Sequence, residues 1–185
     1  MNRMARQIAA AKALGIHDSA RTFALTTAAM MDGVVACFDG KYAYNRWRPV
    51  TAIRAADTDG NSSTDPDASW LPDGWTGGPG GRFITPSHSE YPSGHAVIGP
   101  SGMYALIALH GNNQNLELPS VTLPGVSRHY SKISDAANDI AVSRIYVGYH
   151  FRTTVTRSVD MARKWASGPS QNDCFLSNEA FAGAA

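Results

Sequence analysis

A chain of 185 residues can hold one domain with a hydrophobic core, and a hydrophobic content of 43% is ordinary for a globular protein. Its formal net charge of +1 provides no overall basic field, which argues against nucleic acid as a partner and means that any anion site must be local. Polar residues interrupt the apolar runs, so no membrane span is expected. We therefore expect a single domain over residues 1–185.

The first segment, MNRMARQIAAAKALG, has the pattern of an amphipathic helix and lacks the long apolar centre of a signal peptide. This predicts a cytoplasmic protein if the chain is complete. The helical pattern begins with no lead-in, however, which favours a fragment or a minimal form without further upstream helices. The two cysteines, Cys37 and Cys174, lie far apart in the sequence, and two free thiols are favoured over a disulfide.

The next segments predict a helix followed by a long loop. Apolar residues recur at helical spacing over residues 20–45, and Asp18 or Ser19 could cap that helix. Pro49 is expected to stop or bend it. Residues 56–92 are full of turn formers and predict a long ordered loop, which Trp70 and Trp75 could pin.

The rest of the chain is again mostly helical. An apolar helix is predicted from His95 to about His110, and further helices at residues 134–149 and 154–166. Residues 111–131 predict an irregular segment with a short strand. The expected fold class is all-α, a helical bundle with one long irregular loop.

The first segment whose residues could carry chemistry is KYAYNRWRP, which contains Lys41 and Arg48. They are seven residues apart, about two helical turns, so they could share one helix face. Taken alone, a solvated basic face is the simpler interpretation.

The second segment, EYPSGH, stands where the loop becomes a helix. A helix start offers free N–H groups and a positive dipole end, so it can hold an anion. Gly94 lets the backbone approach a ligand, Ser93 can donate hydrogen bonds from its backbone and side chain, and His95 can move protons. The simpler alternative is a helix cap beside a buried histidine.

The third segment, SRIYVGYH, contains Arg144 and His150. Gly148 predicts that the helix ends before His150, which would swing the imidazole back toward Arg144. Alone, this is equally typical of a helix C-terminus with a stacked histidine. Together, the three segments supply two arginines, a lysine, a serine, a glycine amide and two histidines, which suit a tetrahedral oxyanion.

In this order the three segments resemble a known signature. Lys-x6-Arg-Pro, Pro-Ser-Gly-His and Ser-Arg-x5-His are shared by the vanadium-dependent haloperoxidases and the type 2 phosphatidic acid phosphatase superfamily, and here they span residues 41–150. The contexts DGKYAYNRWRPVTAIR, ADTDGN and YPSGHA resemble the soluble haloperoxidase-like branch. The resemblance implies a helical bundle of the haloperoxidase/acid phosphatase type, with an oxyanion pocket between helices.

The resemblance also implies roles for these residues. Vanadate, or phosphate in the same site, would have its equatorial oxygens bound by Lys41, Arg48, Ser93, Gly94 and Arg144. His150 would bond vanadium axially, or attack phosphorus in a phosphatase. His95 would be the acid–base partner of the apical oxygen.

The activity that the resemblance implies is a haloperoxidase. Vanadate would act as a Lewis acid, Lys41 would polarise hydrogen peroxide, and halide would be oxidised to a hypohalous acid equivalent that reaches a small organic acceptor. The resemblance places His88 at a position that holds a phenylalanine in chlorinating members and a histidine in brominating ones. This favours bromide. A surface-loop histidine is the simpler alternative for His88.

Two departures from the family pattern leave alternatives open. Thr154 stands where the family usually has an aspartate that orients the last histidine; threonine could accept its hydrogen bond but supplies no charge, and Asp139 or Asp160 could substitute. The N-terminal side is also short, so a fragment, a minimal form or a homodimer that completes the bundle are all compatible. The alternatives are an acid phosphatase with a phosphohistidine at His150, and a non-catalytic member that only binds oxyanions.

Cation sites are disfavoured. The segment ADTDGNSSTDPD places its glycine too early and lacks the closing glutamate of a calcium loop. The spacing of His88, His95 and His150 is not typical of zinc, and neighbouring arginines would repel a cation.

Overall fold

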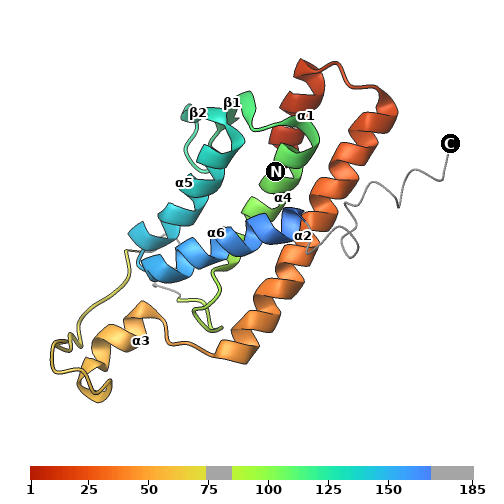
Figure 1. Ribbon diagram of the computed structural model, residues 1–185. Coiled ribbons are helices and arrows are strands. Elements are labelled where there is room, and N and C mark those ends of the chain that lie inside the picture. Colours follow the sequence, from red (N-terminus) through yellow and green to blue (C-terminus); the bar gives the residue numbers. More distant parts are fainter. Residues whose placement is uncertain (74–84, 168–185) are drawn as a thin grey trace.

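The computed structural model describes residues 1–73 and 85–167 (Figure 1). Its helices and strands, in chain order, are α1 (Asn2–Ala11), α2 (Ile16–Tyr44), α3 (Pro49–Arg54), the 3-10 turn η1 (Ala56–Thr58), α4 (Gly94–His110), β1 (Asn113–Pro119), β2 (Ser127–Lys132), α5 (Ile133–Tyr146) and α6 (Arg152–Ser167). This helical bundle with one small sheet confirms the predicted fold class.

Helix α4 lies at the centre of the bundle. It packs against α2, α5 and α6, and Figure 1 shows α2 running the length of the molecule. A Cβ atom placed on Gly33 of α2 would come within 2.8 Å of Ser101 Oγ, so glycine permits the close approach of α2 and α4. The buried side chains of α4 are small or aliphatic, which suits a helix surrounded by others: Ala96, Val97, Met103, Ala105 and Leu106.

The N-terminal helix closes one end of the core. The predicted amphipathic helix is confirmed as α1, which buries Met4 and Ile8 against Leu106, Leu116 and Ile133. Buried apolar side chains from α1, α4, β1 and α5 therefore form one cluster, which stabilises this end of the bundle.

The segment expected to be irregular, residues 111–131, is more ordered than predicted. It forms an antiparallel pair in which Leu116 lies opposite Tyr130, joined by a loop with Gly125 at φ +80°. The pattern around Leu116 and the Pro-Gly turn were signals of a hairpin that the sequence analysis did not use.

The first long helix begins and ends earlier than the sequence suggested. Its N-cap is Gly15, without a side-chain cap, so the predicted cap at Asp18 or Ser19 is wrong. Asn45 ends α2 in the left-handed conformation, at φ 40°. Pro49 does not stop α2 but begins α3, where its missing N–H costs nothing. Because a turn separates Lys41 from Arg48, the two do not share a helix face, contrary to the prediction.

Helix α2 also bears on the membrane question. The stretch Ile16–Arg54 is long and apolar enough to cross a membrane by length and composition. Core helices of soluble proteins pass the same test, so this is weak evidence for a span. The buried face of α2 includes Thr22, Thr26 and Lys41, polar side chains that suit contacts within a protein.

The long loop is partly described. The carbonyl of Trp70 accepts a hydrogen bond from Arg54 Nε at 2.9 Å, which ties the loop to α3. Trp75 and Cys174 lie outside the described residues. Cys37 is buried with a free thiol.

Candidate active site

A cavity of about 390 Å³ lies where α2, α4 and α5 meet the loop before α4. One part of its wall is apolar, with Phe38, Pro86, Ile98 and Ile140. The other part carries seven of the eight candidate residues from the sequence: Lys41, Arg48, His88, Gly94, His95, Arg144 and His150. The eighth, Ser93, is adjacent in the chain and fully buried.

Lys41 is held by the loop that precedes α4. Its Nζ donates to the carbonyls of Ser89 and Pro92 at 2.7 and 2.6 Å, and lies 3.4 Å from that of Glu90. An ammonium has three donors, so the carbonyls occupy all of them. Burial lowers the pKa of Lys41 to about 8. The side chain therefore clamps α2 to this loop and places a positive charge behind it.

Arg48 follows the turn after α2 and is also engaged by the protein. Its Nε donates to the His88 carbonyl at 3.1 Å, and Nη1 donates to the Tyr149 carbonyl at 3.0 Å. Its Nη2 lies 3.2 Å from His88 Nδ1, and the His88 ring packs edge-on to Phe38. His88 is thus a pocket residue rather than a surface-loop histidine. Burial lowers its pKa, which favours a neutral ring.

Arg144 reaches the pocket from the end of α5. Its guanidinium lies 5.1 Å from the centre of the Tyr149 ring, and its Nε is buried without a hydrogen-bond partner. Gly148, at φ +72°, ends the helix as predicted. A Cβ there would come within 3.0 Å of Pro72 Cα, so glycine is required by both conformation and contact. The turn brings Arg144 and His150 to the same cavity.

The start of α4 forms the pocket floor. Ser93 is the N-cap residue and Gly94 the first residue of the helix, whose first-turn N–H groups have no partner within the helix. The Ser93 N–H already donates to Ser158 Oγ at 2.9 Å, so only its side chain is available, and that hydroxyl is buried with no partner. His95 is exposed at the pocket; partial burial and the charge of Arg144 lower its pKa.

His150 is bound by a carboxylate that the sequence analysis missed. Its Nδ1 lies 3.0 Å from Glu90 Oε1, and both side chains are almost completely buried. Burial lowers the pKa of His150 to about 4, so the imidazole is neutral near pH 7. Burial would raise the pKa of Glu90, but hydrogen bonds from His150, Thr154 and Phe151 bring it below its usual value. The contact is therefore a hydrogen bond from a neutral ring to a carboxylate.

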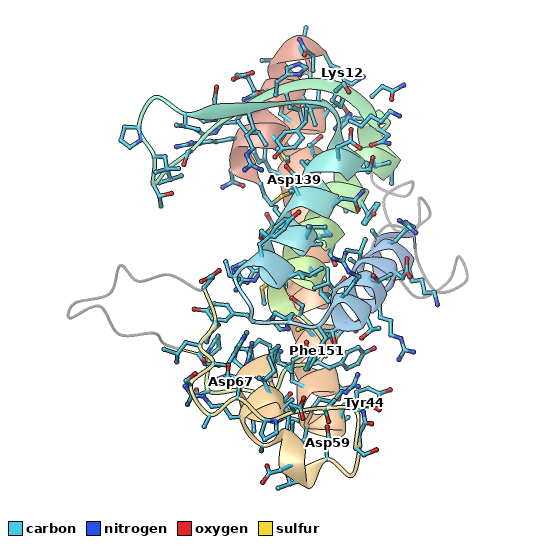
Figure 2. The ribbon with its side chains drawn as sticks, turned by 90° about the vertical axis from the view of Figure 1, so that its left-hand side faces the viewer. Lys12, Tyr44, Asp59, Asp67, Asp139 and Phe151 are labelled. Carbon is cyan, nitrogen blue, oxygen red and sulfur yellow. The ribbon has the colours of Figure 1, made fainter. Side chains whose placement is uncertain are left out.

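This arrangement corrects the interpretation of Thr154. Its Oγ1 donates to Glu90 Oε2 at 2.8 Å, so it holds the carboxylate instead of accepting from the histidine. Neither predicted substitute reaches the site. Asp139 pairs with Arg128 and Tyr130, and Asp160 pairs with Arg163. Figure 2 shows Asp139 on α5 well away from Phe151, the neighbour of His150.

The available donors fit an oxyanion. Arg144 Nε and Ser93 Oγ are buried donors without protein partners, and such groups are costly unless a ligand or water satisfies them. The start of α4 and the nearby cations favour negative charge. Within residues 1–73 and 85–167, no group of three His, Cys, Asp or Glu side chains could hold a bare metal cation. The cavity thus suits an oxyanion such as vanadate or phosphate, whose oxygens accept hydrogen bonds from such donors.

Comparison with known proteins gives two kinds of match. Residues 21–171 match the family described as the VCPO second helical-bundle domain. Among solved structures, a bacterial vanadium-dependent iodoperoxidase superposes with a TM-score of 0.73 at 25% identity, over 89% of this chain and 36% of that one. No curated protein gives a significant match.

Two structures of bacterial vanadium-dependent chloroperoxidase show the same fold. The holo form matches with a TM-score of 0.57 at 23% identity, over 75% of this chain and 32% of that one. The apo form matches with a TM-score of 0.64 at 22% identity, over 83% of this chain and 36% of that one. The chain therefore spans about a third of the length of these proteins.

Proposed function

The chain belongs to the family of the VCPO second helical-bundle domain, and on this premise we propose that its pocket binds vanadate and supports the oxidation of halide by hydrogen peroxide. Bound vanadate would supply Lewis acidity that activates peroxide toward halide. Because the chain spans about a third of the solved haloperoxidases that it matches, the activity of a whole enzyme is part of this proposal.

The observation that carries the proposal is that two of the four buried side-chain atoms without partners in the described residues belong to the signature segments; the other two, Thr26 Oγ1 and Ser101 Oγ, lie on α2 and α4. Arg144 Nε and Ser93 Oγ come from different helices, and neither has a hydrogen-bond acceptor in the protein. Both belong to segments of the three-part signature. An oxyanion beside the start of α4 would satisfy both and would be favoured by the helix dipole.

The other residues divide the remaining tasks. Arg48 and Lys41 add positive charge from the opposite side, and Gly94 contributes a backbone N–H at the start of α4. His150 would present its second ring nitrogen, Nε2, to vanadium or to phosphorus. His95 stands at the open side of the pocket, where a neutral imidazole can take or give a proton.

We propose that His88 influences which halide is oxidised, with bromide favoured. Its ring lies between Phe38 and Arg48, so a substitution there would change both the apolar contact and the hydrogen bonding of the arginine. The solved relatives are described as iodo- and chloroperoxidases, so the three halides should be assayed side by side.

The pocket has room for more than the oxyanion. Its volume is about 390 Å³, and its apolar wall includes Phe38, Ile98 and Ile140. This space suits a small organic group beside the charged residues. We propose that this wall receives the organic acceptor of the halogen.

An acid phosphatase is the second candidate, and Glu90 specifically favours it. A phosphohistidine intermediate needs a strongly nucleophilic His150, which a carboxylate on Nδ1 supports. Glu90 supplies that carboxylate to Nδ1 at 3.0 Å, so His150 could serve as a nucleophile through Nε2. Vanadate and phosphate have similar shapes, and the binding residues alone do not distinguish them.

Paired assays on one preparation test these functions. The protein is loaded with orthovanadate and assayed for peroxide-dependent oxidation of chloride, bromide and iodide; the unloaded protein is assayed for hydrolysis of an aryl phosphate. We expect vanadate-dependent halide oxidation that falls about 1000-fold in His150→Ala, because the variant lacks the proposed vanadium ligand. The matched control is His17→Ala, which changes an exposed histidine on α2.

The other outcomes separate the alternatives. Phosphate release that vanadate inhibits, without halide oxidation, would replace the haloperoxidase by the phosphatase. If both assays are silent while His150→Ala keeps most of the wild-type anion affinity, the chain is an oxyanion-binding member without catalysis.

A further inference from the structure

The carboxylate of Glu90 has three hydrogen-bond partners and no contact with solvent. Its Oε1 accepts from the Phe151 N–H at 3.0 Å and lies 3.0 Å from His150 Nδ1, and its Oε2 accepts from Thr154 Oγ1 at 2.8 Å. The residue is 0% exposed. A buried carboxylate needs such donors to stay ionised, and an ionised carboxylate can only accept. The Nδ1 of His150 must therefore carry a proton.

The contact at the other ring nitrogen, Nε2, independently supports the same tautomer. Arg48 Nη1 lies 3.5 Å from His150 Nε2, and a guanidinium has donors but no acceptor. An N–H at Nε2 would point a donor at a donor. The ring therefore keeps its proton on Nδ1, and Nε2 carries the free electron pair.

We propose that Glu90 is the positioning residue for His150, fixing the ring and its Nδ1–H tautomer so that Nε2 is unprotonated and can bond the oxyanion centre, and that Thr154 secures Glu90. This inference deepens the proposed function and rests on it for the identity of the oxyanion. It assigns the orienting carboxylate to the loop before α4 instead of to α6, where the family resemblance places it.

The loop that carries Glu90 is fixed from three sides. Lys41 Nζ donates to the Ser89 and Pro92 carbonyls, and the Glu90 N–H donates to the Arg46 carbonyl at 3.0 Å. On α6, Ser158 Oγ accepts from the Ser93 N–H at 2.9 Å. A carboxylate on an anchored loop can hold a ring orientation as well as one on a helix.

Helix α6 contributes hydroxyls in place of a carboxylate. Thr154 and Ser158 are one turn apart and buried, and both face the loop. Thr154 donates to the Glu90 side chain, and Ser158 accepts from the loop backbone. The charge therefore lies on the loop before α4, and the hydroxyls that support it lie on α6.

Nitrogen NMR of the unloaded protein tests the tautomer without vanadate or activity. With ¹⁵N-labelled histidine, we expect the His150 ring to show a protonated Nδ1 and an unprotonated Nε2, with the Nδ1 proton shifted downfield by the carboxylate. Glu90→Gln keeps the shape and removes the charge, so that proton should move upfield. A wild-type ring protonated at Nε2 would overturn the inference, whatever the fate of the variants.

Oxyanion binding supplies the second readout. We expect Glu90→Gln to weaken vanadate binding by about tenfold or more, the usual scale for residues that orient a ligand. Thr154→Val keeps Glu90 and His150 and should weaken binding less, while Thr154→Ser should restore it. The control is Asp139→Asn, which removes a carboxylate paired with Arg128 outside the pocket. Equal affinity in Glu90→Gln and wild type would contradict a positioning role.

A double variant separates position from mere folding. Glu90→Gln with Thr154→Asp moves the carboxylate to the side where the family carries it, and we expect vanadate affinity to recover to within about threefold of wild type. Thr154→Asp alone places two carboxylates together and should destabilise the protein. If the NMR result holds but neither vanadate nor phosphate binds, the proposed function fails while the role of Glu90 stands.

Discussion

The two sides of the pocket use their cations differently. On the α2 side, Lys41 and Arg48 direct their donors at backbone carbonyls and at His88. On the side formed by α5 and the start of α4, Arg144 Nε and Ser93 Oγ have no acceptor in the protein. The first pair therefore helps to build the pocket, whereas the second pair has donors to offer a ligand. Residues with similar charge in one pocket should then respond differently to substitution.

The largest effect on stability is expected on the α2 side. Arg48→Met would leave the Tyr149 and His88 carbonyls without their buried donor, and we expect a loss of about 3 kcal/mol in the free energy of unfolding. Urea unfolding followed by circular dichroism measures it. The control is Arg46→Met, since that side chain is exposed. A stable Arg48→Met protein with weak anion binding would erase the contrast between the two sides.

Arg144→Met is expected to weaken anion binding and to leave stability nearly unchanged, the reverse of Arg48→Met. It removes a half-buried guanidinium whose buried Nε is unpaired, so anion affinity should fall by about 30-fold, the scale of one charge-assisted hydrogen bond. The unfolding free energy should change by less than about 1 kcal/mol, because no buried carbonyl depends on this Nε. Calorimetric titration with tungstate measures the affinity. Affinity equal to wild type would show that the anion does not contact Arg144.

Lys41 should make anion binding to the pocket weaker at alkaline pH. Its pKa is lowered to about 8 by burial, so the side chain loses its charge as the pH rises through that value. Tungstate does not titrate in this range, and we expect its affinity to fall by about tenfold from pH 7 to 9. The folded state favours neutral Lys41, so its contribution to stability should rise, not fall, between about pH 8 and its usual pKa near 10.5. Lys41→Met should bind tungstate with little pH dependence.

Ser93→Ala is expected to have the smallest effect. The hydroxyl is buried with no partner, so its removal should leave the unfolding free energy unchanged or slightly higher. Anion affinity should decrease about fivefold, as expected for one neutral hydrogen bond. Ser158→Ala is the informative comparison, since that hydroxyl has two partners and its loss should destabilise the protein. A destabilised Ser93→Ala would mean that the hydroxyl already has a structural role.

The sequence was most informative where structure is local. Helical spacing of apolar residues predicted the helices, and Gly148 predicted the turn that carries His150 into the pocket. The interpretation failed at Asn45, whose left-handed conformation ends α2 before Pro49. Asparagine tolerates that conformation, but nothing in a single sequence required it here. The hairpin was missed because its signals are weak, a short alternation around Leu116 and the turn at Gly125.

The sequence predicted which residues line the cavity, but it did not predict which groups those residues contact. The motifs singled out the residues that line the cavity, because each motif combines a chemical group with a local backbone feature. The partners of these groups depend on tertiary contacts. Glu90 stands in the EYPSGH motif itself, so a carboxylate three residues before Ser93 was a signal available in the sequence. Its link to His150 required the fold.

The link between Glu90 and His150 also has a consequence for folding. An aspartate four residues after the histidine would approach it within one helical turn, whereas Glu90 and His150 are 60 residues apart in the chain. Their contact forms only after a long loop has closed and α4 and α6 have docked. It is lost whenever the segment before α4 separates from the turn before α6, even if every helix persists. The ring orientation of His150 is therefore a reporter of complete tertiary assembly that measurements of helix content would miss.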